Sequence, residues 1–304
     1  MQRKRSIPLV MFTLLILVAP IAVWGQESFT TIDYPGANLT VAMGINPRGD
    51  IVGYYRDPVT PPTPVTYGEI HGFFLGRGGF VSIDYPQATY TDIWAINPRG
   101  DIVGSYIDSA GIQHGFLLNE AGFTSIDVPG ATFTAAFGIN PEGDIVGHYG
   151  VPPTGRMNGF LLSNGSSTTY AHPAAEAANK MSCGMGINPQ GEIVGHYQDS
   201  LGIHGFLLNE AGFTSIDIPG GKNLQAYGIN PKGEIVGFYT EIGTVPAKIH
   251  GFFMDKWGAF TQVDIPGAVG TWVRRNNARG DLVGNYTTTD AAGTTTSHGF
   301  LMRR

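Results

Sequence analysis

One stretch of sequence recurs six times along this chain and constrains its fold more than any other feature. The clearest copy, residues 138–149, reads Gly-Ile-Asn-Pro-Glu-Gly-Asp-Ile-Val-Gly-His-Tyr. The other copies start at Gly44, Ala95, Gly186, Gly228 and Arg275. In each copy an Asn-Pro-x-Gly turn, or its variant at residues 277–280, joins two apolar segments with β-prone residues. Each copy therefore predicts a β-hairpin.

Two further strands follow each hairpin. In the second unit they are residues 114–118, His-Gly-Phe-Leu-Leu, and residues 123–127, Phe-Thr-Ser-Ile-Asp, with a short turn between them. Pro129 marks the end of the fourth strand, since proline cannot donate to a strand ladder. The asparagines of successive turns are 42 to 51 residues apart. Four short antiparallel strands at that spacing are typical of a β-propeller blade.

The two ends of the chain predict how the ring closes. Residues 29–35 form a fourth-type strand with no first three strands before it, whereas residues 271–304 supply three strands and no fourth. An N-terminal strand that completes the C-terminal blade removes the open edge. We therefore predict an all-β fold, a single six-bladed β-propeller of four-stranded antiparallel blades in residues 26–304.

Residues 1–25 have the pattern of a secretory signal peptide. Arg3, Lys4 and Arg5 precede an apolar stretch, residues 7–23, and a cleavage site is expected near Gly25. An uncleaved membrane anchor is the alternative. Cleavage removes three positive charges, so the formal net charge changes from −6 to −9. We expect a secreted protein, extracellular or periplasmic, that is monomeric and binds neither nucleic acid nor, after cleavage, a membrane.

The repeated motifs resemble those of a known family. Gly-Phe-x-x-Ile-Asp-x-Pro-Gly-Ala, Gly-Ile-Asn-x-x-Gly-x-Ile-Val-Gly-x-Tyr and His-Gly-Phe-Leu are similar to the HAF family of extracellular repeat proteins, over nearly all of the chain after residue 25. This resemblance implies export and a repeated β fold, but no settled activity and no catalytic residues. Three places depart from the pattern: Asn158, Ala171 and the sequence Arg274-Arg275-Asn276.

Residues that recur at the same place in most units are expected to be structural. The histidines of the His-Gly-Phe motif and the aspartates that end the fourth strands each occur at a fixed place in separate blades. We therefore predict no metal site from them, and we expect the aspartates to accept hydrogen bonds from backbone amides. These residues are His71, His114, His204, His250 and His298, with Asp33, Asp84, Asp127, Asp217 and Asp264.

Unrepeated residues on the innermost strands are better candidates for binding. Two variable columns lie two residues apart, and they either pack one blade onto the next or line the central channel. The candidate ligand-binding residues are Asp92, Trp94, Tyr227, Trp272, Arg274 and Arg275. We expect Arg274 to contact a ligand and Arg275 to pair with Asp92, because neighbours on a strand point to opposite sides. The variable loops, between second and third strands and between blades, mark the expected functional face.

No catalytic motif is present: the chain has no Gly-x-Ser-x-Gly, His-Glu-x-x-His, P-loop or EF-hand sequence. This favours a non-catalytic binding or interaction module without a cofactor. Its extracellular ligand is unknown, and aromatic and cationic candidates suit a carbohydrate or a small anion. The alternative is a propeller hydrolase or lyase that acts on a carbohydrate or small ester at the channel mouth. That alternative requires Asp92 to meet two or more further acids or histidines.

Overall fold

A computed structural model describes residues 22–23, 29–58 and 69–304 of the chain. Over these ranges the fold is all-β, apart from one short helix, α1 (Pro173–Ala177). The predicted signal peptide lies outside the described residues except for β1 (Ala22–Val23), which pairs in parallel with β22 (Phe260–Val263). No helix in the described ranges is long and apolar enough to cross a membrane.

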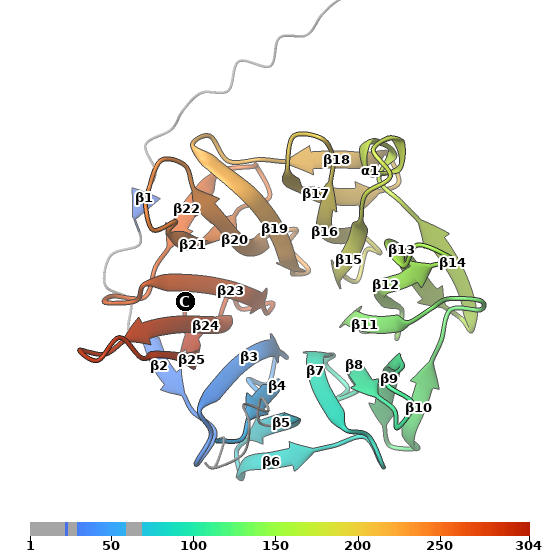
Figure 1. Ribbon diagram of the computed structural model, residues 1–304, viewed down its shortest axis with the longest axis horizontal. Coiled ribbons are helices and arrows are strands. Elements are labelled where there is room, and N and C mark those ends of the chain that lie inside the picture. Colours follow the sequence, from blue (N-terminus) through green and yellow to red (C-terminus); the bar gives the residue numbers. More distant parts are fainter. Residues whose placement is uncertain (1–21, 24–28, 59–68) are drawn as a thin grey trace, which may run out of the picture.

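Antiparallel pairing groups the other strands into six units of four, arranged around a central axis (Figure 1). Unit 1 consists of β3 (Leu39–Ile45), β4 (Ile51–Arg56), β5 (Ile70–Gly76) and β6 (Gly79–Ile83). Unit 2 consists of β7 (Tyr90–Ile96), β8 (Ile102–Ile107), β9 (Gln113–Asn119) and β10 (Gly122–Ile126). Unit 3 consists of β11 (Thr134–Ile139), β12 (Ile145–Val151), β13 (Arg156–Ser163) and β14 (Ser166–Tyr170). Unit 4 consists of β15 (Ser182–Ile187), β16 (Ile193–Gln198), β17 (Ile203–Asn209) and β18 (Gly212–Ile216). Unit 5 consists of β19 (Gly221–Ile229), β20 (Ile235–Glu241), β21 (Ile249–Met254) and β22. Unit 6 consists of β23 (Gly270–Asn276), β24 (Leu282–Thr289), β25 (Thr295–Met302) and, from the start of the chain, β2 (Phe29–Ile32).

The predicted pairing between the two ends of the chain is confirmed. β2 runs antiparallel to β25, with Phe29 opposite Met302 and Ile32 opposite Gly299. The expectation of six four-stranded blades is met only in part. Units 2, 3 and 4 are separate, but units 1, 5 and 6 join with β1 in one 13-stranded sheet. They join because the innermost strand of one unit starts beside the third strand of the preceding unit, where single parallel bridges form between β21 and β23 and between β25 and β3.

A repeated contact between a phenylalanine and a glycine forms the core of each unit. The phenylalanine of the third strand is fully buried in all six units, as Phe206 is in unit 4. It packs on the glycine of the second strand. A Cβ added to Gly195 would lie 2.0 Å from the Cys183 carbonyl oxygen and 2.8 Å from the ring of Phe206. The Ile-Val-Gly motif therefore ends in glycine because no side chain fits between these groups.

This packing predicts the result of adding one methyl group. Gly195→Ala should reduce the free energy of unfolding by about 3 kcal/mol, because either the carbonyl or the phenylalanine must move. The control is Gly78→Ala, since a Cβ at Gly78 meets no atom within 4 Å. Urea unfolding monitored by tryptophan fluorescence measures both. Equal stability of the two variants would show that the second-strand glycine is not required.

Candidate functional site

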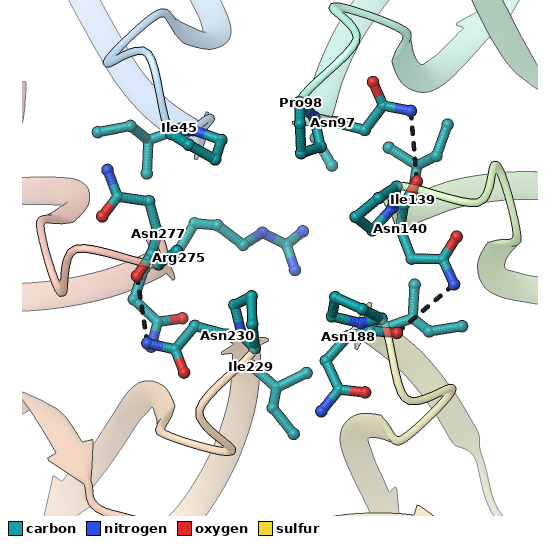
Figure 2. Close-up of a pocket in the computed structure, with 18 of the residues that line it drawn as sticks. Ile45, Asn97, Pro98, Ile139, Asn140, Asn188, Ile229, Asn230, Arg275 and Asn277 are labelled. Atoms are coloured by element: carbon teal, nitrogen blue, oxygen red, sulfur yellow. Dashed lines mark hydrogen bonds between the residues drawn. The ribbon is translucent and has the colours of Figure 1, made fainter.

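A cavity of about 80 Å³ lies on the axis, at the end formed by the Asn-Pro turns (Figure 2). Its walls are the isoleucines that precede those turns, and prolines of the turns form its rim. The isoleucines are Ile45, Ile96, Ile139, Ile187 and Ile229. Unit 6 departs from this pattern, because there Asn276 replaces the isoleucine and Ala278 the proline. The cavity is thus at the face of the constant turns, opposite to the variable loops where we expected a ligand.

The asparagines of the turns join neighbouring units around this cavity. Asn97 Nδ2 donates to the Asn140 carbonyl oxygen at 3.3 Å, and it also donates to Asp101 at 2.8 Å. Asn277 Nδ2 likewise donates to the Asn46 carbonyl oxygen at 3.3 Å, which links unit 6 to unit 1. The side-chain amides of these asparagines therefore already donate to acceptors within the protein. Their repetition therefore reflects the construction of the ring, as the sequence indicated.

Arg275 forms the floor of the cavity. Its side chain extends from β23 into the centre of the ring (Figure 2), where it is 9% exposed. The guanidinium donates to four backbone carbonyls, each in a different unit. The acceptors are Met185 and Tyr227 for Nη1, at 3.2 and 2.6 Å, and Trp94 and Phe137 for Nη2, at 3.4 and 2.7 Å. Burial lowers the pKa of Arg275 to about 10, so it remains charged at neutral pH.

The predicted pairing of Arg275 with Asp92 is wrong. The carboxylate of Asp92 instead accepts hydrogen bonds from Ser105, at 3.0 Å from the amide and 2.6 Å from the hydroxyl. The hydroxyl of Tyr90 donates to its other oxygen at 2.9 Å. Burial raises the pKa of Asp92, and these hydrogen bonds oppose that shift. Backbone carbonyl groups, rather than an acid, satisfy this arginine.

The other predicted ligand-binding residues lie at the axis but do not line the cavity. Arg274 donates from Nε to Asn285 at 3.1 Å, and its guanidinium lies 4.8 Å from the ring centre of Tyr227. Trp94 lies 6.4 Å from Tyr227 across the axis. Trp94 and Trp272 pack against a hydrophobic cluster formed by the two variable columns. These columns therefore do face the axis, but they fill it as a packed core.

A β-bulge explains why two adjacent arginines both turn toward the axis. The register between β23 and β24 skips from Val273 to Arg275, so Arg274 has no opposite partner. The extra residue of a bulge disrupts the alternation of side chains. The expectation that Arg274 and Arg275 point to opposite sides is therefore wrong. The same skip occurs in the innermost strand of every unit.

Sequence reasoning missed several buried polar groups near the axis. His196 is buried and His148 is partly buried, and the Nδ1 atom of each is buried without a partner in the part of the chain that the structure describes. Burial lowers their pKa values to about 3 and about 4. Arg275 Nε and Asn276 Oδ1, which belong to two cavity-lining residues, are also buried without a partner there. One signal was available for Arg275 and Asn276, which break the repeat, whereas His148 and His196 occupy its variable position before the tyrosine.

The repeated histidines form networks within their own units. His114 Nδ1 lies 2.7 Å from Asp127 and Nε2 lies 3.4 Å from Asp108, while its ring stacks on Tyr106. Burial lowers the pKa of His114, but the two carboxylates outweigh it and raise the pKa overall. The aspartates thus pair with histidines, rather than with backbone amides as expected. Among the described residues, no group of three His, Cys, Asp or Glu side chains could hold a metal ion.

Two departures from the repeat occur in the same unit. Asn158 stands where other units have the histidine, and Ala171 follows β14 where they have the aspartate. Unit 3 has therefore lost both partners of one interaction. This paired loss supports the structural role predicted for the repeated histidines.

Comparisons with known proteins support the fold and leave the activity open. No protein-family model matches the chain, and no curated protein matches it. The putative TolB of Agrobacterium tumefaciens is similar in structure, with 14% identity over 88% of this chain and 91% of that one, and a TM-score of 0.55. A protein of unknown function from Dyadobacter fermentans matches with 11% identity over 93% and 98%, and a TM-score of 0.51. AofleA from Arthrobotrys oligospora matches with 11% identity over 90% and 86%, and a TM-score of 0.50. TolB is a β-propeller, and at such low identity the likeness shows the fold alone.

Proposed function

We propose that the chain is an exported, monomeric, six-bladed β-propeller of the HAF type, in which the six units are the blades and β2 closes the ring. In this proposal it acts as a non-catalytic binding module. Its ligand is a small anion that enters the axial cavity above Arg275, or a carbohydrate that places one hydroxyl group in it. Export rests on the predicted signal peptide, and family membership rests on the repeated motifs.

One observation carries the binding proposal: the axial cavity is lined by residues with an unpaired donor and an unpaired acceptor. Arg275 Nε and Asn276 Oδ1 are both buried, and each unsatisfied group costs about 1–3 kcal/mol. A ligand hydroxyl that reaches either atom gains a hydrogen bond that the protein leaves unmade. A small anion would instead meet the positive charge of Arg275, whose hydrogen-bond acceptors within the described ranges are neutral carbonyls. The isoleucine and proline walls suit the apolar part of such a ligand.

The catalytic alternative lacks its required feature in the described residues. It needed Asp92 to meet further acids or histidines, and the hydrogen-bond partners of that carboxylate are Ser105 and Tyr90. The proposal therefore remains with binding. Asp92, Trp94, Tyr227, Trp272 and Arg274 have a supporting role in it, because they form or surround the core beneath Arg275.

Calorimetric titration of the purified exported chain tests this proposal. The probes are simple monosaccharides and polyols in one series, and halides, formate and acetate in another. We expect saturable binding in one series, and its loss in Ala278→Trp, where an indole at the cavity rim blocks entry. The matched control is Ala121→Trp, on an exposed turn away from the axis, which should bind normally. Binding by neither series, or equal binding by both tryptophan variants, rejects the axial cavity as the ligand site.

A further inference from the structure

The carbonyl groups around Arg275 form a ring with a common origin. Its four acceptors are the carbonyls of Trp94, Phe137, Met185 and Tyr227. Each of these residues immediately precedes the glycine or alanine that begins a copy of the repeat. They come from units 2, 3, 4 and 5, whereas the guanidinium comes from unit 6. A single side chain therefore joins five of the six units at the axis.

The β-bulge is what frees these carbonyls. In the innermost strand of each unit the register skips one residue, and in units 2 to 5 the skipped residue is the one that accepts from Arg275. A bulge leaves its extra residue unpaired in the ladder. In these four units the carbonyl of that residue is directed to the axis and bonds the guanidinium. The carbonyl ring is thus a property of the repeat, and Arg275 is the exception that fills it.

Space at the axis allows only one such side chain. A Cβ added to Gly186 would lie 2.8 Å from Arg275 Nη1, and also 2.8 Å from the Tyr227 carbonyl oxygen. The other copies carry glycine or alanine at the position of Arg275. Within the described residues Arg275 makes no ion pair, so neutral carbonyl dipoles stabilise its charge. Rings of carbonyl oxygens stabilise bound cations in the same way in other proteins.

We propose that the centre of the ring is a cation-binding site made of backbone carbonyls, whose occupant is the protein's own guanidinium. Removal of that side chain leaves a site for a free cation of matching shape. Arg275→Ala removes the side chain beyond Cβ, and ethylguanidinium restores the removed atoms. Arg275 belongs to both this site and the ligand site proposed above, but the carbonyl ring lies beneath the cavity and requires no external molecule in the native chain.

Chemical rescue of Arg275→Ala tests the proposal. The melting temperature of the variant should fall by about 10 °C, because four buried carbonyls lose their donor. Ethylguanidinium or guanidinium at about 20 mM, far below denaturing concentrations, should recover at least half of this loss in a saturable manner. Ethylurea is the neutral control of similar shape and should recover nothing. The wild type should not respond to any of the three.

One control variant and one alternative measurement complete the test. Arg279→Ala removes an arginine whose guanidinium also donates to a neighbouring unit, at the Pro47 carbonyl, but whose side chain is 47% exposed. That variant should show a small loss and no rescue. If Arg275→Ala does not fold alone, its yield on refolding from urea with guanidinium or with ethylurea is compared instead. Equal effects of the cation and its neutral analogue, in melting or in refolding, overturn the proposal.

Discussion

Deletion of residues 29–35 is expected to lower the free energy of unfolding by more than about 5 kcal/mol and to broaden the melting transition. The deleted segment supplies all four ladder pairs of β2 with β25. Ile32 is buried in a cluster with Leu301 and Val283 of unit 6 and with residues of unit 1. Tyr34 stacks on Tyr55 of unit 1 at 3.6 Å. The segment therefore completes one unit and also joins it to the next.

Differential scanning calorimetry and light scattering measure this effect. Without β2, the edge of β25 is exposed and can pair with another chain, so aggregation on heating is expected as well. Asp33→Ala is the control, because it removes only the half-exposed carboxylate that pairs with His298. It should cost no more than about 1 kcal/mol. A melting curve of the deletion variant that matches the wild type would contradict closure by this strand.

Acidification from about pH 7 to pH 4.5 is expected to destabilise the protein by about 3–5 kcal/mol through two histidines. His148, which is partly buried, and His196, which is buried, are neutral at pH 7, with pKa values lowered to about 3 and about 4. In the unfolded chain both titrate near the ordinary value of about 6.5. The unfolded state therefore binds protons first as the pH falls. Stability is lost below about pH 6.5 until the folded-state pKa values are reached.

The double variant His148→Phe, His196→Phe isolates this contribution. Phenylalanine is the natural residue at the equivalent place in unit 5, where Phe238 packs in the same axial cluster. The pKa of His172 is also lowered and that of His114 is raised, but both residues remain in both proteins. Their contributions to the pH dependence of stability therefore cancel in the comparison. Urea unfolding at several pH values should give a smaller slope for the variant. The same slope for both proteins would show that these histidines are not buried in the neutral form.

Local patterns allowed most of the fold to be predicted. Asn-Pro-x-Gly turns, alternating apolar residues and the unpaired first strand are readable from neighbouring residues, and they predicted the strand order and the contact of β2 with β25. The parallel bridges that merge units 1, 5 and 6 depend on how closely neighbouring units approach. That distance has no local signature in the sequence.

The candidate site was predictable only in its location near the axis. Arg275 stood out because it replaces glycine in a repeat, and it does line the cavity. Its partners lie between 48 and 181 residues away, and all of them are backbone atoms that no residue type reveals. The bulge before it also has no sequence marker. Because we assumed that side chains alternate strictly along the strand, we predicted the wrong side of the strand for one of the two arginines.

Hydrogen exchange at the guanidinium groups tests the central claim most directly, namely that Arg275 lies at the axis and donates to four units. In nitrogen-15 spectra, the Nη protons of Arg275 should give separate signals that exchange slowly with water, because each nitrogen is held by carbonyls. Exposed Arg279 provides the comparison in the same molecule, and Arg275→Lys identifies the signals. Averaged, rapidly exchanging signals for Arg275, like those of Arg279, would contradict the arrangement.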